Sequence, residues 1–192
     1  VDRLVTALDD AGALDDTVIM FSSHNRYLQG EHRVRDAKVV PYEESVHVSL
    51  VVRGPGFPAG QVATQLVGNI DVAPTLVALA GATPRRVMDG RSLLPLAQDP
   101  TLATRRALLL EDWPVGAFVG IPPHYDGVRA PTDVYLQYAN GEREYYDLTT
   151  DPYQLVSRHA DASTASRRTA LAALLNQLKT CSGASCEVVA PP

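Results

Sequence analysis

The sequence of 192 residues has only two cysteines, no excess of positive charge and no long apolar run. Its apolar stretches are far shorter than the roughly 18 residues that a membrane-spanning helix needs, so we expect no membrane span. The 17 Lys and Arg residues are outnumbered by 22 Asp and Glu residues, which gives a net charge of −5. A chain with this balance lacks the basic face that nucleic-acid binding requires. No segment repeats at a fixed period.

The chain has enough apolar character for a sizeable core, because 45% of its residues are hydrophobic. Its length fits one domain, or a domain with a small appendage. The spacing of apolar residues predicts helices over 1–13, 41–46, 70–80 and 162–179. Strands are predicted over 17–22, 46–53, 107–111, 125–129, 134–138 and 144–147.

Three details of this pattern are specific enough to be compared with a structure. The strand over 17–22 is almost wholly apolar, which is typical of a sheet covered on both faces. The pair Asn140-Gly141 predicts a hairpin turn between two strands. In the helix over 70–80, we expect Val72, Leu76 and Leu79 to point inward.

A dense polar loop follows the apolar strand over 17–22 and is the first candidate for a functional site. It contains His24, Asn25, His32 and Lys38. Placing such groups at the mouth of a buried strand costs free energy unless they bind something. In open α/β sheets, ligands bind beyond the carboxyl ends of the strands, which is where this loop falls.

Several motifs, in this order, resemble the C-terminal half of the type I sulfatase core, a family of the alkaline-phosphatase superfamily. They are residues 23–25, 28–33, 38–45, 51–56, 69–76, 88–93, 144–148 and 151–153. The resemblance implies an α/β fold: the C-terminal part of an alkaline-phosphatase-like sandwich with a small antiparallel-sheet-plus-helix subdomain. It divides the chain into core residues 1–104, a C-terminal subdomain over 105–180, and a tail over 181–192.

The resemblance implies a calcium site with His24 and Asn25 as ligands, where the family has an Asp followed by Asn or His and then usually Gly. Asn25 offers a carbonyl oxygen, which suits a hard cation. A neutral imidazole at His24 is a poor calcium ligand, and Arg26 adds a fixed positive charge beside the cation's position. The alternative is that His24 and Asn25 only cap a strand-to-loop turn.

The resemblance also implies catalytic roles for Lys38 and His32. Lys38 aligns with the lysine that contacts the sulfate group, where an ammonium can neutralise a sulfate oxygen as the ester bond breaks. His32 is expected to shape the pocket or to donate a hydrogen bond to substrate. The alternatives are a solvated loop lysine and an ordered histidine tied to a neighbouring carboxylate. His47 and Ser49 stand where relatives commonly have Arg and Pro.

Other polar residues of the resembling motifs are interpreted as parts of the fold or of a substrate entrance. Glu43, Glu44 and Asp71 are expected at helix starts, and residues 89–93 form a turn. Residues of the C-terminal subdomain are expected to line the substrate entrance, because in the family this subdomain overhangs the active site. They are Glu111, Asp112, Trp113, His124 and Tyr125.

The two cysteines, Cys181 and Cys186, lie five residues apart after the last predicted helix. A disulfide closing this loop is geometrically feasible and suits an extracytoplasmic or secreted protein. A zinc site is not expected, because two sulfurs without a nearby His do not complete a zinc coordination shell.

The formylglycine nucleophile of the resembling family requires a Cys/Ser-x-Pro/Ala-x-Arg signature, which neither cysteine provides. The family's first pair of metal-binding aspartates has no counterpart either. The chain begins at Val1 in a helical pattern, with neither an initiator Met nor a signal peptide, and we therefore expect a fragment.

Three functions remain open from the sequence. The first is the C-terminal portion of a hydrolase of small-molecule or glycan sulfate esters, inactive alone because the nucleophile segment is missing. The second is a degenerate, non-catalytic sulfatase-like protein that at most binds anions or a partner. The third is part of a related phosphodiesterase or phosphonate hydrolase. No nucleic-acid partner is expected.

Overall fold

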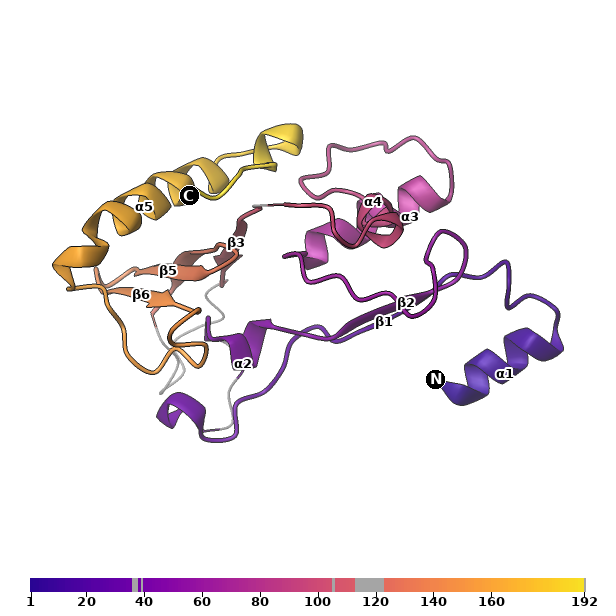
Figure 1. Ribbon diagram of the computed structural model, residues 1–192, viewed down its shortest axis with the longest axis horizontal. Coiled ribbons are helices and arrows are strands. Elements are labelled where there is room, and N and C mark those ends of the chain that lie inside the picture. The colour runs from indigo at the N-terminus through magenta and orange to yellow at the C-terminus, as the bar shows by residue number, and fades with distance from the viewer. Residues whose placement is uncertain (36–37, 39, 105, 113–122, 192) are drawn as a thin grey trace.

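The computed structural model describes residues 1–35, 38, 40–104, 106–112 and 123–191. Figure 1 shows a sheet with a long helix along one face, and an extended part made of a two-stranded ribbon and shorter helices. The N-terminal helix lies at the far end of the ribbon from this sheet. Among the helices of the described residues, none is both long and apolar enough to cross a membrane.

The extended part contains the first four helices and the first two strands. In chain order they are α1 (Asp2–Asp10), β1 (Ile19–Ser22), α2 (Glu43–Val46), β2 (Leu50–Arg53), α3 (Val72–Leu79) and α4 (Leu94–Gln98). Short 3₁₀ turns over Glu31–Arg33 and Asn69–Asp71 precede α2 and α3. α1, α2, α3, β1 and β2 confirm the predicted helices and strands of this region, with shorter bounds, whereas no helix was predicted where α4 lies.

The C-terminal part is a meander of four antiparallel strands followed by a helix. The strands are β3 (Leu108–Glu111), β4 (Tyr125–Arg129), β5 (Asp133–Tyr138) and β6 (Arg143–Asp147), in that order across the sheet. Gly141 has φ +91° in the β5–β6 turn, which confirms the predicted hairpin. A 3₁₀ turn over Ala162–Thr164 leads into α5 (Ala165–Leu178). This sheet with its helix is the expected C-terminal arrangement.

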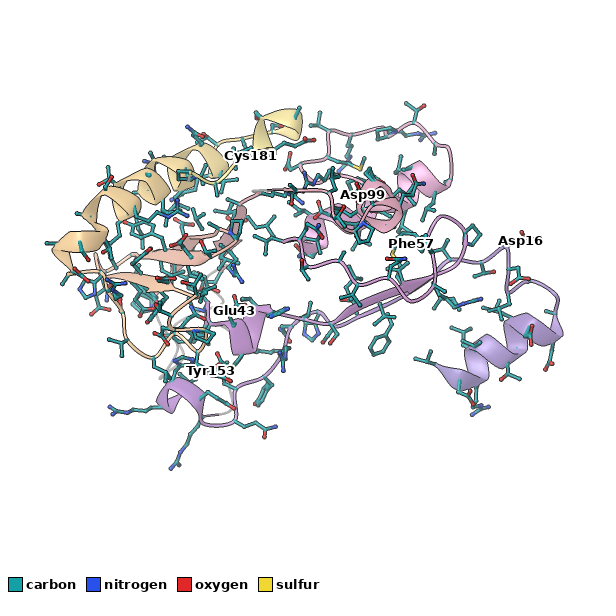
Figure 2. All side chains as sticks on the ribbon, in the orientation of Figure 1. Asp16, Glu43, Phe57, Asp99, Tyr153 and Cys181 are labelled. Atoms are coloured by element: carbon teal, nitrogen blue, oxygen red, sulfur yellow. A yellow bond between two sulfur atoms is a disulfide. The ribbon has the colours of Figure 1, made fainter. Side chains whose placement is uncertain are left out.

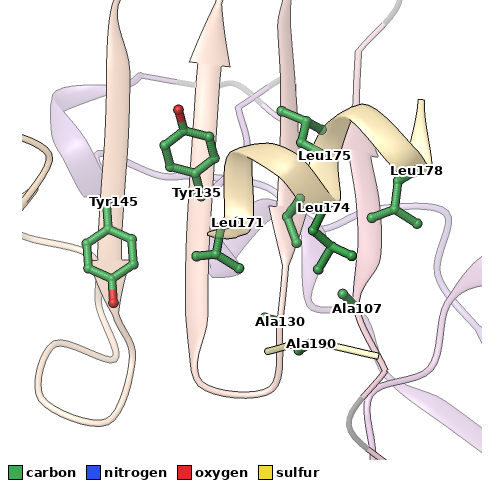
Figure 3. Packing of buried hydrophobic residues seen from close by; sticks show 10 residues of the cluster. Ala107, Ala130, Tyr135, Tyr145, Leu171, Leu174, Leu175, Leu178 and Ala190 are labelled. Atoms are coloured by element: carbon green, nitrogen blue, oxygen red, sulfur yellow. The ribbon is translucent and has the colours of Figure 1, made fainter. Parts of the chain in front are cut away.

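Both faces of this sheet are covered, and successive side chains of each strand contribute alternately to the two faces. Four leucines of α5 pack on one face with Tyr135 and Tyr145, as Figure 3 shows. The opposite face carries Tyr125, Tyr138 and Tyr146, and Tyr42 from the N-terminal part packs against it. The sheet is therefore a middle layer between α5 and the segment that carries the polar loop.

The β1–β2 ribbon leaves large apolar side chains exposed. Phe21 is 52% exposed and Val51 is 61% exposed, and these two residues are paired across the ribbon. The prediction of a strand covered on both faces is therefore wrong within the described residues, where β1 pairs only with β2. Leu76 is also exposed, contrary to its predicted inward position, because α3 buries Pro74 and Thr75 instead.

A buried carboxylate, Asp71, joins three separate segments of the chain. Its side chain is fully buried and accepts hydrogen bonds from the backbone N–H groups of Gly68 and Arg91, at 2.8 and 2.9 Å. It also forms an ion pair with Arg106 at 2.5 Å, just before β3. A Cβ added to Gly90 would lie 2.0 Å from the carbonyl oxygen of Ile70, so only glycine allows this approach. The predicted place of Asp71 at a helix start is confirmed.

The predicted disulfide between Cys181 and Cys186 is present. The loop that it closes donates a hydrogen bond from Gly183 N–H to Asp89 Oδ1, at 2.7 Å. The end of the chain is therefore attached to the turn over residues 87–90, which lies close to the Asp71 network.

We expect Asp71→Asn to destabilise the chain by about 3 kcal/mol or more, because it leaves the Arg106 guanidinium buried without a charged partner. Urea unfolding of the two proteins, followed by circular dichroism, measures this difference. Asp9→Asn is the matched control, because Asp9 lies exposed on α1, and we expect a change within about 0.5 kcal/mol. Equal midpoints for the two variants would contradict the role assigned to Asp71.

Candidate functional site

The polar loop connects β1 to β2, and its two limbs are joined by hydrogen bonds centred on Ser45. Ser45 is buried, its carbonyl oxygen accepts the backbone N–H of Arg26 at 2.9 Å, and its hydroxyl donates to the carbonyl oxygen of Lys38 at 2.7 Å. Ser22 Oγ donates to the carbonyl oxygen of Ser49 at 2.9 Å. The antiparallel ribbon thus brings both limbs together, and Ser45 fixes their backbones.

Two of the predicted site residues, His24 and Lys38, are in contact. The Lys38 ammonium lies 3.3 Å from Nε2 of His24. Because an ammonium only donates, Nε2 of His24 acts as the acceptor in this contact. Asn25 follows His24 and is half-buried, and its backbone carbonyl accepts the hydroxyl of Ser23 at 2.6 Å. The structure therefore places the Lys38 ammonium beside His24, one of the two expected metal ligands.

The residues at this position fit a calcium ion poorly. Calcium prefers six to eight oxygen ligands that include carboxylates. The side chains of His24, Asn25 and Arg26 offer an imidazole, one amide oxygen and a guanidinium instead. The imidazole is already engaged by Lys38. Among the described residues, no group of three or more His, Cys, Asp or Glu side chains is arranged to hold a metal ion.

His32, the fourth predicted site residue, lies on the other side of the loop. Its backbone has φ +52°, its side chain is 8% exposed, and its ring stacks on Tyr42 with the centroids 3.8 Å apart. Nε2 lies 3.1 Å from the Glu44 carboxylate. These contacts correspond to the ordered histidine tied to a carboxylate, which the sequence left open beside the catalytic role. No contact with His24 or Lys38 occurs among the described residues.

Helix α2 attaches the loop to the C-terminal part of the chain through Arg129 and Gln154, two residues that sequence reasoning missed. Glu43, labelled in Figure 2, is the first residue of α2 and forms two hydrogen bonds with the Arg129 guanidinium of β4, at 2.7 and 3.2 Å. The Glu43 backbone N–H donates to Oε1 of the buried Gln154 at 2.8 Å. Both contacts join residues more than 80 positions apart, so no local pattern in the sequence indicated them.

A half-buried carboxylate, Glu144, lies on the loop-facing side of the sheet. Glu144 accepts hydrogen bonds from the hydroxyls of Tyr42 and Tyr146, at 3.4 and 3.0 Å, and also interacts with Tyr138. Burial raises the pKa of Glu144 above its ordinary value of 4.5, and the tyrosine hydroxyls oppose this shift. This cluster connects the loop to the sheet through Tyr42, whose ring also stacks on His32.

The residues predicted at a substrate entrance form their own network at one end of the sheet. Asp112 Oδ1 lies 2.7 Å from Nδ1 of His124 and accepts the backbone N–H of Tyr125 at 2.9 Å. Glu111 is the exposed last residue of β3. Trp113 lies outside the described residues. Contacts between this network and Lys38 or His24 do not occur in the described part of the chain.

An open hollow in the surface lies away from the loop, beside the turn that follows β2. It is lined by Gly54, Gly56, Phe57, Pro58 and Gln98. None of these side chains carries a charge or a nucleophile. The loop between β1 and β2 therefore remains the candidate site.

Comparison with known proteins relates this chain to the sulfatases. Residues 30–181 match the family model described as N-sulphoglucosamine sulphohydrolase, C-terminal. The chain is 34% identical to an arylsulfatase of Volvox carteri, over 97% of this chain and 33% of that protein.

Solved structures show the same relationship. A structure of a protein in complex with its substrate D-glucosamine-2-N,6-O-disulfate superposes with a TM-score of 0.85 at 27% identity, covering 93% of this chain and 37% of the other. The phosphonate monoester hydrolase of Agrobacterium radiobacter gives a TM-score of 0.78 at 27% identity, with coverages of 93% and 38%. The chain thus spans between a third and two fifths of the length of these relatives.

We expect Glu43→Ala to loosen the loop, because it removes the ion pair that attaches α2 to β4. The amides of Ser45, Val46 and His47, which are bonded within α2, should exchange with solvent deuterium faster than in the unmodified chain. Glu142→Ala is the matched control, because Glu142 is an exposed residue of the β5–β6 turn. Unchanged protection at these three amides in Glu43→Ala would show that the ion pair does not hold the loop.

We expect a pH-dependent effect of Glu144→Gln on stability. The pKa of Glu144 is raised on folding, so its favourable contribution is complete below about pH 4.5 and is lost as the pH rises through the folded-state pKa. Glutamine keeps the neutral form at every pH. The variant should therefore have a higher Tm than the unmodified chain at neutral pH, and this difference should shrink as the pH falls through the folded-state pKa and be smallest below about pH 4.5.

Scanning calorimetry across this pH range makes the measurement, and Glu142→Gln on the exposed turn is its control. A Tm difference for Glu144→Gln that is constant with pH would contradict the raised pKa of Glu144 in the folded chain.

Proposed function

Because this chain belongs to the sulfatase family and corresponds to the C-terminal part of its α/β fold, we propose that it contributes one wall of the pocket in a hydrolase of organic sulfate esters. The single observation that carries this proposal is the position of Lys38. The match covers residues 30–181, which includes Lys38 and the C-terminal sheet. Lys38 lies in contact with His24, at the end of β1.

In the proposed reaction, Lys38 stabilises negative charge on the sulfate group as the ester bond breaks. An ammonium suits this task because it is a compact point charge that can approach one oxygen closely. Preorganisation increases the effect of this ammonium. The Ser45 hydroxyl fixes the Lys38 backbone by donating to the carbonyl oxygen of Lys38. The contact with His24 orients the ammonium toward the end of β1.

The proposed nucleophile is a formylglycine hydrate supplied by a part of the fold that this chain does not span. The chain's own sulfurs do not provide it, because Cys181 and Cys186 are bonded to each other. The proposed wall is therefore a positioning and charge-stabilising component, and we propose that the 192-residue chain alone has no sulfatase activity.

The proposed substrate is a sulfated glycan or a small sulfate ester. A structural relative is described in complex with a disulfated glucosamine, at 27% identity, which supports a sugar substrate for this chain. The disulfide supports an extracytoplasmic location, because disulfides persist in oxidising compartments.

A second candidate function is the hydrolysis of phosphonate or phosphate esters. The phosphonate monoester hydrolase of Agrobacterium radiobacter has the same fold over 93% of this chain at 27% identity, so the fold alone does not distinguish the two chemistries. The non-catalytic alternative is supported by His24 and Arg26, because an imidazole and a guanidinium at the expected calcium position fit this ion poorly. The experiment below distinguishes these functions.

We expect a chimeric enzyme, in which residues 1–192 replace the matching third of an active sulfatase, to cleave a chromogenic aryl sulfate. Lys38→Ala in this chimera should lower kcat/KM by about 100-fold or more, because it removes a preorganised positive charge from the transition state. Lys179→Ala is the matched control, because this other lysine pairs with Asp126 on the C-terminal sheet, and we expect activity close to that of the chimera.

The unmodified chain, assayed without the remainder, should show no turnover with or without calcium. Faster cleavage of a phosphonate monoester than of a sulfate by the chimera would favour the second candidate. A folded chimera without either activity would favour the non-catalytic alternative. Equal effects of the two lysine variants would contradict the role assigned to Lys38.

A further inference from the structure

The loop between β1 and β2 carries four cationic side chains within thirteen positions. They are Arg26, Arg33, Arg35 and Lys38. None of the four forms an ion pair with a carboxylate among the described residues. The Arg26 guanidinium donates to the backbone carbonyl of His47 at 3.2 Å, and Lys38 contacts the imidazole of His24.

Three carboxylates of the same region have other partners, and a fourth, Asp36, lies outside the described residues. Glu31 accepts the backbone N–H of Gln29 at 2.6 Å. Glu43 pairs with Arg129 of the C-terminal sheet, and Glu44 lies 3.1 Å from His32. Glu43 is therefore paired with a cation from outside the loop, whereas Glu31 and Glu44 keep their negative charge within it. Neither Arg26 nor Lys38 uses any of these three carboxylates as its partner, since their side chains contact His47 and His24 instead.

Two of the cations, Arg26 and Lys38, share a buried anchor. Ser45 is 1% exposed, and it holds the backbone of Arg26 through its carbonyl oxygen and the backbone of Lys38 through its hydroxyl. The bond to His47 also restrains the guanidinium of Arg26. Arg33 and Arg35 have no such anchor in the described part of the loop. The two anchored cations are therefore preorganised, and the other two are ordinary surface charges.

We propose that Arg26 and Lys38 form a binding site for the tetrahedral oxyanion of a sulfate or phosphate monoester that requires no divalent cation. This inference rests on the proposed assignment of Lys38 to an ester pocket, and goes beyond it by assigning Arg26 the charge that a metal ion would otherwise supply. A guanidinium presents parallel N–H donors that match two oxygens of such an anion, and an ammonium binds a third as a point charge.

The residues around this pair favour an anion over a metal ion. A calcium ion at this place would lie beside a fixed guanidinium and an ammonium, and the three positive charges would repel one another. An oxyanion is attracted by the same two groups. Asn25, which is half-buried and precedes Arg26 in the chain, carries a neutral amide that is able to donate to an oxyanion.

The test is a calorimetric titration of the 192-residue chain with inorganic sulfate and, separately, with inorganic phosphate, at constant ionic strength. The titrations are done in EDTA and repeated in excess calcium chloride. We expect the same affinity in both conditions. Arg26→Gln and Lys38→Gln should each weaken binding about tenfold, because each removes a charged hydrogen bond.

Arg35→Gln is the matched control, because it removes the same charge from the same loop at a position without an anchor. We expect it to change the affinity by about twofold or less. Stronger binding of sulfate than of phosphate would assign the site to sulfate esters, and the reverse order to phosphate esters. Circular dichroism confirms that each variant is folded.

Three outcomes would overturn the inference: no binding by the folded chain, binding that requires or is strengthened by calcium, or equal weakening by Arg35→Gln and Arg26→Gln. These failures are distinct from failure of the proposed function. A chimera that cleaves sulfate esters while the anion requires calcium would retain the function and overturn this inference. Calcium-independent binding of the anion, with no hydrolysis by the chimera, would retain this inference and contradict the proposed function.

Discussion

The buried ion pair between Asp71 and Arg106 is the interaction on which the arrangement of the two parts of the chain depends. Arg106 stands immediately before β3, so its partner determines where the C-terminal sheet begins relative to α3. Removing both charges from water costs free energy. This desolvation cost is offset here because Asp71 also accepts hydrogen bonds from two backbone N–H groups. Two guanidinium nitrogens of Arg106 have no hydrogen-bond partner among the described residues, so Asp71 is its main compensation.

The second link between the parts is the attachment of the polar loop to the sheet. Glu43 pairs with Arg129, and Tyr42 joins the tyrosine cluster around Glu144, so the loop is supported from the face opposite α5. Lys38 lies in a loop, yet Ser45 of the attached helix α2 bonds its backbone directly. A loop positioned in this way combines the exposure that ligand binding needs with the precision of a packed element. The described residues of the C-terminal sheet therefore support the loop through Arg129 and the tyrosine cluster.

The sequence indicated the elements that depend on local patterns. The hairpin at Asn140-Gly141 and α5 were predicted because their turn residues and apolar spacing are contiguous. The expectation that Lys38 and His24 belong to one site came from a resemblance rather than from a local rule, because these residues are 14 positions apart, and their direct contact was not predicted. The partners of Glu43 and Asp71 were not predicted, since no local pattern relates a carboxylate to an arginine 86 or 35 positions away. Leu76 was placed wrongly because periodicity finds an apolar face but not what covers it.

The exposed ribbon has a consequence for how the chain behaves at high concentration. Strand β1 pairs with β2 along one edge, and its other edge meets no strand in the part of the chain that the structure describes. The run from Val18 to Phe21 contains neither a charge nor a proline, which are the residues that discourage strands from adding to one another. Separate copies are thus able to extend the ribbon edge to edge, with Phe21 and Val51 stacking between them. Colloidal self-association, more than unfolding, is therefore expected to set the concentration at which the isolated polypeptide stays in solution.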